Sequence, residues 1–164
     1  MPIHTIFTFI LIIAVWKTEV WKNWSRYYST ILFFALGDLM YQFLFDEKPL
    51  WIHNSTWLSE KQVNLVWICL IYPCTTLLLL SFYEKQKNAV KKGCYVFFWF
   101  LIYVVLEVFL CRFRLISYYN GWNFYWSVGF DVFMFNILLL HNYKPLWAML
   151  VASIFAIIAM YIFL

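Results

Sequence analysis

Long apolar runs separated by short charged segments dominate the chain. Runs such as TTLLLLSF and CYVFFWFLIYVVL do not alternate apolar and polar residues, as the strands of a membrane β-barrel would. Several runs approach the roughly 17–25 residues that an α-helix needs to cross about 30 Å of hydrocarbon. The pattern therefore predicts an all-α fold, a polytopic transmembrane helix bundle that forms a single domain over 1–164. About six spans are expected, at 3–16, 27–45, 63–83, 94–111, 122–140 and 145–164.

The first expected span, residues 3–16, is the shortest. It rises only about 21 Å at 1.5 Å per residue, which is less than the hydrocarbon thickness. The bundle has five spans if this segment lies at the membrane interface.

A kink is expected in the third span at Pro73. Proline lacks the amide hydrogen that would bond the carbonyl of Cys69.

The amino-acid composition excludes a soluble globular protein. Hydrophobic residues make up 65% of the 164 residues, aromatic residues 24% and charged residues 12%, a balance that does not cover a water-facing surface. The formal net charge is +4. The arrangement of Lys and Arg around the spans accounts for this charge, so no nucleic acid is expected as a partner.

Lys and Arg fall unevenly on the two sides of the membrane that six spans define. The side richer in cations is expected to be cytoplasmic, because cytoplasmic loops of membrane proteins carry an excess of Lys and Arg. Both termini and the loop 46–62 then lie outside. The expected cytoplasmic cations are Lys17, Lys22, Arg26, Lys85, Lys87, Lys91, Lys92 and Lys144, and the expected outer ones are Lys48, Lys61, Arg112 and Arg114.

Three acidic residues, Asp38, Glu107 and Asp131, fall inside expected spans. An ionisable residue at a helix centre costs about 2.5–3.5 kcal/mol on insertion scales, so such residues face the bundle interior and are functional candidates by default. Counted from the expected span ends, all three lie in the outer half of the membrane. A structural alternative stays open, in which each acid only ties two helices together through hydrogen bonds.

Other polar residues accompany these acids at helical spacing. Tyr41 and Gln42 follow Asp38 by one turn, and further polar side chains recur at i, i+4 and i+8 on the fifth span. Arginines just beyond the fourth span are expected to lean back toward the carboxylates. We therefore expect one polar ligand-binding pocket, open to the outer face, with the loop 46–62 folded over it. Its candidate residues are Asp38, Glu107, Asp131, Gln42, Tyr41, Asn64, Asn123, Ser127, Arg112 and Arg114.

The sequence contains no motif for a metal or a cofactor. The four cysteines, Cys69, Cys74, Cys94 and Cys111, form no C-x-x-C pair, and no histidine stands at metal-ligand spacing to them. Gly-rich phosphate loops and nucleophile elbows are also missing from the sequence. We therefore expect no metal site and no cofactor, and we assign no catalytic residue.

Four segments, YYSTILFFALGDLMYQFLF, PLW, YPCTTLLLL and WNFYW, carry a family resemblance. The chain resembles a family of small, uncharacterised multi-span membrane proteins from endospore-forming Gram-positive bacteria such as Bacillus and its relatives. The resemblance covers nearly the whole chain, and GDLMYQFL is its most specific part. It implies a multi-pass protein of the bacterial plasma membrane. It implies no activity, so no catalytic residue transfers from it.

Three functions remain open from the sequence. The first is the binding or transport of a cation, a proton or a small polar solute that enters from outside. The second is a non-catalytic accessory protein of the cell or spore membrane. The third is a membrane-embedded lipid or isoprenoid enzyme that uses paired carboxylates, which the lack of a nucleophile, metal or phosphate motif disfavours. Membrane lipid is the expected partner, and a homo-oligomer is left open because six short helices make a small transporter.

Overall fold

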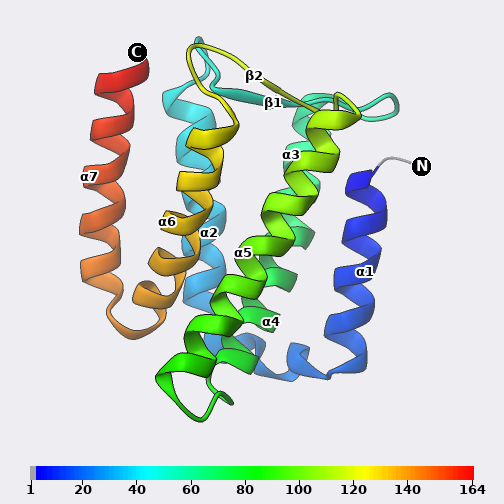
Figure 1. Cartoon of the computed structure of the whole chain (residues 1–164), viewed down its shortest axis with the longest axis vertical. Helices are drawn as coiled ribbons and strands as arrows, with labels where there is room; N and C mark the ends of the chain where they lie inside the picture. Colours follow the sequence, from blue (N-terminus) through cyan, green and yellow to red (C-terminus); the bar gives the residue numbers. More distant parts are fainter. Residues whose placement is uncertain (1–2) are drawn as a thin grey trace.

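The structure, a computed structural model, describes residues 3–164 as a bundle of helices that run alternately down and up (Figure 1). The first described residues and the C-terminus lie at the same end of this bundle. A 3₁₀ helix, η1, joins the first two helices, and a π-helical segment, η2, joins α3 to α4 without a break. The bounds are α1 Ile3–Lys17, η1 Val20–Asn23, α2 Trp24–Leu44, α3 Glu60–Val66, η2 Trp67–Ile71, α4 Tyr72–Tyr83, α5 Ala89–Arg112, α6 Phe124–Tyr143 and α7 Pro145–Phe163.

Four helices of the described chain are long and apolar enough to cross a membrane: Glu60–Tyr83, α5, α6 and α7. Helix α1 and the segment Val20–Leu44 meet this criterion only together, as a pair bent by 82°, so the number of candidate spans is four, or five if this pair counts as one span. The 15 residues of α1 rise about 22 Å, less than the thickness of the hydrocarbon core. A helical bundle with long apolar helices is therefore confirmed, whereas six separate spans remain a prediction.

Side-chain caps determine where two of the helices begin. Helix α5 begins at Ala89, before the expected residue 94, because the Asn88 side chain accepts a hydrogen bond from the Lys91 amide at 2.9 Å. Helix α3 begins at Glu60, directly after Ser59, because Ser59 and Gln62 form a capping box there. Both caps lengthen their helices into polar sequence beyond the apolar run.

Pro73 widens one turn of the helix Glu60–Tyr83 and does not end it. Because proline has no amide hydrogen, it fits only where no intrahelical bond is required of it, and it occupies the first turn of α4. The turn before it, η2, is π-helical. The irregularity expected at Pro73 is thus a π-helical turn on the helix that lines the candidate site.

A two-stranded antiparallel sheet lies across the end of the bundle where the described chain begins and ends (Figure 1). Strand β1, Trp51–His53, pairs with β2, Ile116–Tyr118, so that Trp51 stands opposite Tyr118. The sheet adds two short strands to an otherwise helical fold, one of them within the segment 46–62 that was expected to be a loop. Each strand has three residues, too few for period-two alternation to be recognised in the sequence.

The buried core lies where α2, α4, α5 and α6 pack together. Two buried polar contacts connect helices within it: the Thr30 hydroxyl lies 3.0 Å from Nδ1 of His141, and the Thr75 and Tyr103 hydroxyls are 2.8 Å apart. Helix α7 packs on α6 and contributes only Ala148 to the buried residues. The largest fully buried side chains include Tyr27, Phe135, Leu50, Ile71, Leu79, Leu80 and Leu138.

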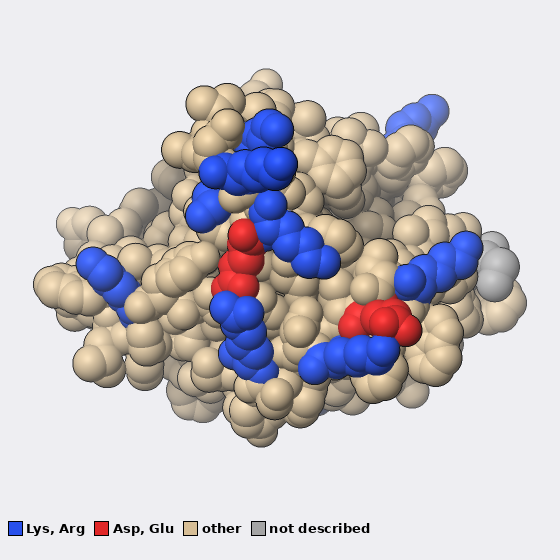
Figure 2. All heavy atoms as spheres, turned by 90° about the horizontal axis from the view of Figure 1, so that it is seen from below, with Lys and Arg blue, Asp and Glu red and all other residues tan. Residues whose placement is uncertain are grey.

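Lys and Arg gather at the end of the bundle opposite the sheet. Figure 2 looks onto this end and shows many basic side chains around a few acidic ones. The connections α1–α2, α4–α5 and α6–α7 all lie at this end. Two ion pairs also form at this end, Lys22–Glu19 at 2.7 Å and Arg26–Glu84 at 2.8 Å. The charge asymmetry expected from the sequence is therefore an asymmetry between the two ends of the folded bundle.

We predict that the basic end faces the cytoplasm. A fluorescent protein that matures only in the cytoplasm should be bright when fused after Lys87 and dark when fused after Leu164. The reason is that the α4–α5 connection and the end of α7 lie at opposite ends of the bundle. Cell fluorescence, normalised to the amount of fusion protein, measures the result. A bright fusion at Leu164 together with a dark fusion at Lys87 would reverse the orientation.

Candidate functional site

A polar cleft of about 330 Å³ lies at the sheet end of the bundle, between α2, strand β1 and the helix Glu60–Tyr83. Acidic, amide and aromatic side chains line it together. Four of the candidate residues, Asp38, Tyr41, Gln42 and Asn64, are among them. The complete lining is Asp38, Tyr41, Gln42, Phe45, Asp46, Pro49, Trp51, Ile52, His53, Glu60, Lys61, Asn64, Trp67 and Tyr72.

Asp38 faces the interior of the bundle and is half-buried. Gln42, one helical turn later, donates through Nε2 to Oδ2 of Asp38 at 2.6 Å. From the facing helix, the Tyr72 hydroxyl donates to Oδ1 at 3.0 Å. Each carboxylate oxygen thus has one donor and keeps further lone pairs, which point to a capacity for binding another group.

Tyr41 fixes strand β1 over the cleft. Its hydroxyl accepts hydrogen bonds from the amides of Leu50 and Trp51 and donates one to the Trp51 carbonyl, each at 3.0 Å. Its ring stacks on the Trp51 indole with centroids 3.8 Å apart and planes 3° apart. Because these contacts use the hydroxyl fully, Tyr41 shapes the wall of the cleft and its ring, not its hydroxyl, faces a ligand.

The cleft carries more negative than positive side chains. Asp38, Asp46 and Glu60 line it together with one cation, Lys61. None of these four side chains forms an ion pair within residues 3–164. Asp46 and Glu60 are exposed at the mouth, and Asp38 lies deeper. An unpaired acidic excess in a recess attracts cations to it.

His53 lines the cleft without adding positive charge. Burial and the charge of neighbouring His4 lower the pKa of His53 to about 3, so its imidazole is neutral at physiological pH. The ring lies 5.0 Å from the Trp67 ring, measured between centroids. His53 therefore does not reduce the excess of negative charge in the cleft.

Glu107 and Asp131 lie apart from this cleft. Glu107 is buried, and the Tyr118 hydroxyl of strand β2 donates to its Oε1. Ser127 lies beside the same carboxylate, and the buried Asp131 is close enough for its charge to interact with that of Glu107. The three acids that were expected to lie within spans thus form two groups, Asp38 in the cleft and Glu107 with Asp131 between α5 and α6, whereas one pocket was expected.

Across the described residues, no three His, Cys, Asp or Glu side chains come together as they would around a metal ion.

Tyr72 lies between the two groups of acids, because its hydroxyl bonds Asp38 and interacts with the charge of Asp131. The separation follows from the helix order: Asp38 faces α4, whereas Glu107 and Asp131 face one another across α5 and α6.

Arg112 and Arg114 do not approach the carboxylates. Both are exposed, and neither has an ion-pair partner in the part of the chain that the structure describes. Helix α5 ends at Arg112, and Arg114 adopts a left-handed conformation with φ 55° in the turn that leads to β2. Tyr118 on that strand reaches Glu107 in their place.

Asn123 is a helix cap and not a member of the cleft. Its side chain accepts hydrogen bonds from the amides of Tyr125 at 3.0 Å and Trp126 at 3.3 Å, which satisfies the start of α6. The expected polar stripe of α6 is therefore divided. Asn123 caps the helix at the surface, whereas Ser127 and Asp131 meet Glu107 inside.

Several contributors to the two sites, among them Tyr72, Tyr118 and Glu60, were not among the site residues predicted from the sequence. The contact of Tyr72 with Asp38 joins residues 34 positions apart, which no local pattern signals. Glu60 was visible as an acid at the start of the third span, yet its place at the mouth depends on how β1 folds back.

No protein-family model, curated protein or solved structure matches the chain. The resemblance found around Asp38 therefore stays a prediction. The function has to be inferred from the geometry of the cleft.

We predict that Tyr41→Phe loosens the wall formed by β1. The change removes the hydroxyl that holds the amides of Leu50 and Trp51, so the segment should open more often, by about 1 kcal/mol or roughly fivefold. Cleavage by the glutamate-specific protease Glu-C after the exposed Glu47, followed by mass spectrometry, measures this opening. Tyr28→Phe is the control, because Tyr28 lies on the same helix and is exposed. Equal cleavage rates in the two variants would contradict the role of Tyr41.

Proposed function

We propose that the cleft binds a small organic cation from the outer face of the membrane and that the protein transports it. The observation that carries this proposal is the cluster of Asp38, Asp46 and Glu60 in one aromatic-lined recess, none of them paired with a cation within residues 3–164. Only Lys61 offsets their charge. A positively charged solute fits this arrangement, because it would neutralise the excess.

Aromatic side chains favour an organic cation over an inorganic one. Trp51, Trp67 and Tyr72 line the same recess as the carboxylates. The face of an aromatic ring attracts an ammonium group by about 0.5–2 kcal/mol, and a recess that combines such rings with carboxylates suits alkylated amines. We therefore propose a primary to quaternary amine as the solute class.

Transport is supported by the helix that forms one wall. Its π-helical turn η2 places Trp67 in the lining, and Tyr72, the partner of Asp38, follows directly after it. Widened turns of this kind often occur at functional sites, where a helix changes its local geometry. An intramembrane carboxylate beside such a turn is the arrangement expected where a solute passes through a helix bundle.

The outer location rests on charge. The cleft lies at the end of the bundle opposite the Lys and Arg cluster of Figure 2, and that cluster is the end proposed to face the cytoplasm. The family resemblance adds the bacterial plasma membrane as the proposed location. A solute would then reach Asp38 from the cell exterior, passing Asp46 and Glu60 at the mouth.

Calorimetric titration of the purified protein with tetramethylammonium tests the binding step. We expect Asp38→Asn and Asp46→Asn each to weaken binding about tenfold, or about 1.4 kcal/mol, because each change removes a carboxylate that lines the cleft. Glu47→Gln is the matched control, because Glu47 adjoins Asp46 in the sequence and does not line the cleft. Uptake of labelled tetramethylammonium into proteoliposomes should follow the same order.

Two results would contradict the proposal. Equal weakening by Glu47→Gln would show that the general surface charge, and not the cleft, attracts the cation. Unchanged binding in Asp38→Asn combined with a lower melting temperature would show that Asp38 only joins α2 to α4. The second result would favour the accessory role over binding and transport.

A further inference from the structure

The acidic residues that line the polar cleft occupy two positions along its length. Asp38 lies at the deep end, where the Tyr72 hydroxyl donates to it at 3.0 Å. Asp46 and Glu60 lie exposed at the mouth. The axis of α2 rises about 10 Å between Asp38 and Phe45, and Asp46 follows directly. The cleft is therefore elongated along the helices and carries negative charge at both ends.

The stretch between these two positions is aromatic on both walls. On α2, Tyr41 follows Asp38 by one turn, and the Trp51 indole of strand β1 stacks on its ring with centroids 3.8 Å apart. On the facing helix, Trp67 begins the π-helical turn that precedes Tyr72, so it lies on the mouth side of that tyrosine. Apolar walls of this kind favour methylene groups. The order of acid, aromatic wall and acid therefore matches an aliphatic chain with a positive group at each end.

The net charge of the cleft also suits two positive groups. The three carboxylates of Asp38, Asp46 and Glu60, set against the single ammonium group of Lys61, leave an excess of two negative charges. A solute with one positive group neutralises half of this excess, whereas a diamine neutralises all of it. Clefts of about 300 Å³ or more hold ligands of drug size, so a cleft of about 330 Å³ has room for more than one ammonium group.

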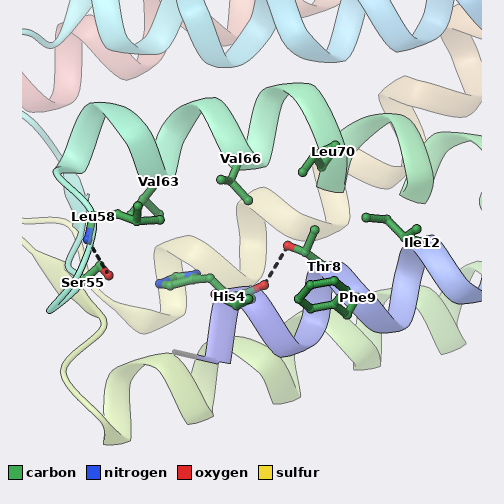
Figure 3. Close-up of a pocket in the computed structure, with 10 residues that line it drawn as sticks. His4, Thr8, Phe9, Ile12, Ser55, Leu58, Val63, Val66 and Leu70 are labelled. Atoms are coloured by element: carbon green, nitrogen blue, oxygen red, sulfur yellow. Dashed lines mark hydrogen bonds between the residues drawn. The ribbon is translucent and has the colours of Figure 1, made fainter. Parts of the chain in front are cut away.

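A second cavity lacks these features. It is a groove of about 260 Å³ between α1 and the helix Glu60–Tyr83 (Figure 3). Most of its lining is apolar, including Phe9, Ile12 and Leu70, and no Asp or Glu of the described chain lines it. An amine in this groove would leave water without gaining a counter-charge, which is costly. Of these two cavities, the polar cleft is therefore the one that suits a cation.

We propose that the solute of the polar cleft is a linear aliphatic diamine whose two ammonium groups lie about 10 Å apart. This inference rests on the proposed function and narrows its class of solute. One ammonium group binds the Asp38 carboxylate, the other lies between Asp46 and Glu60, and the methylene chain crosses the aromatic stretch. An extended chain advances about 1.2 Å per bond, so a diamine with eight methylene groups spans about 11 Å between its nitrogens.

Calorimetric titration of the unaltered protein with matched amines tests the second ammonium group. The probe 1,8-diaminooctane is compared with 8-amino-1-octanol, which has the same length and a hydroxyl in place of one ammonium group. We expect the diamine to bind at least about fivefold more tightly, because its second ammonium group meets exposed carboxylates at the mouth.

A shorter pair, 1,4-diaminobutane and 4-amino-1-butanol, tests the spacing. This diamine spans only about 6 Å, so it does not reach both positions at once. Its advantage over the amino alcohol should stay near about twofold, the factor that two equivalent ends give. A fivefold or larger advantage in the shorter pair would overturn the proposed spacing.

Variants at the mouth locate the second ammonium group. In the double variant Asp46→Asn with Glu60→Gln, the ratio between the dissociation constants of 8-amino-1-octanol and 1,8-diaminooctane should fall to about two. Glu47→Gln is the matched control, because Glu47 is exposed, adjoins Asp46 and does not line the cleft, so the ratio should stay unchanged. A ratio that stays at five in the double variant would overturn the assignment of the mouth position.

The unaltered protein separates this inference from the proposed function. Equal affinity for 1,8-diaminooctane and 8-amino-1-octanol, together with binding of tetramethylammonium, would overturn the diamine and leave the proposed function intact. If neither tetramethylammonium nor either eight-carbon amine binds, the proposed function fails as well. Both results are independent of whether the double variant folds.

Discussion

The Asp38 carboxylate must be satisfied within an apolar helix, and the arrangement of the candidate site depends on this constraint. Gln42 satisfies it from the same helix, and Tyr72 satisfies it across the interface with α4. An unpaired polar group at this depth would cost several kcal/mol, so α2 and α4 have to approach with these faces together. Because Tyr72 follows the π-helical turn, the same contact places the irregular part of the long helix against the acid.

Strand β1 completes the site through aromatic packing. The stacked rings of Tyr41 and Trp51 hold the strand at the mouth, and the pairing of β1 with β2 carries Tyr118 to Glu107. One short sheet therefore serves both groups of acids, since it covers the Asp38 cleft with one strand and supplies a partner to Glu107 with the other.

The helices could be predicted from the sequence because each contains a long apolar run. The cluster of Asp38, Tyr41 and Gln42 could also be predicted, because one helical turn brings those residues together. Capping residues such as Asn88 extend the helices beyond the runs, which explains the differences at their ends. Contacts between distant segments were beyond prediction. Tyr72 meets Asp38, and Tyr118 meets Glu107, only because of how the helices pack and how two three-residue strands pair. For the same reason, equal depth in the membrane did not place the three acids together.

The three aspartates of the chain, Asp38, Asp46 and Asp131, allow one direct measurement of the proposed binding site. Protein labelled with ¹³C at the aspartate side-chain carboxyl gives three resonances, two from the cleft and one from outside it. On titration with tetramethylammonium, the Asp38 and Asp46 resonances should shift together with a single dissociation constant, and the Asp131 resonance should stay in place. Three resonances that stay fixed, or an Asp131 shift as large as that of Asp38, would contradict cation binding in the cleft.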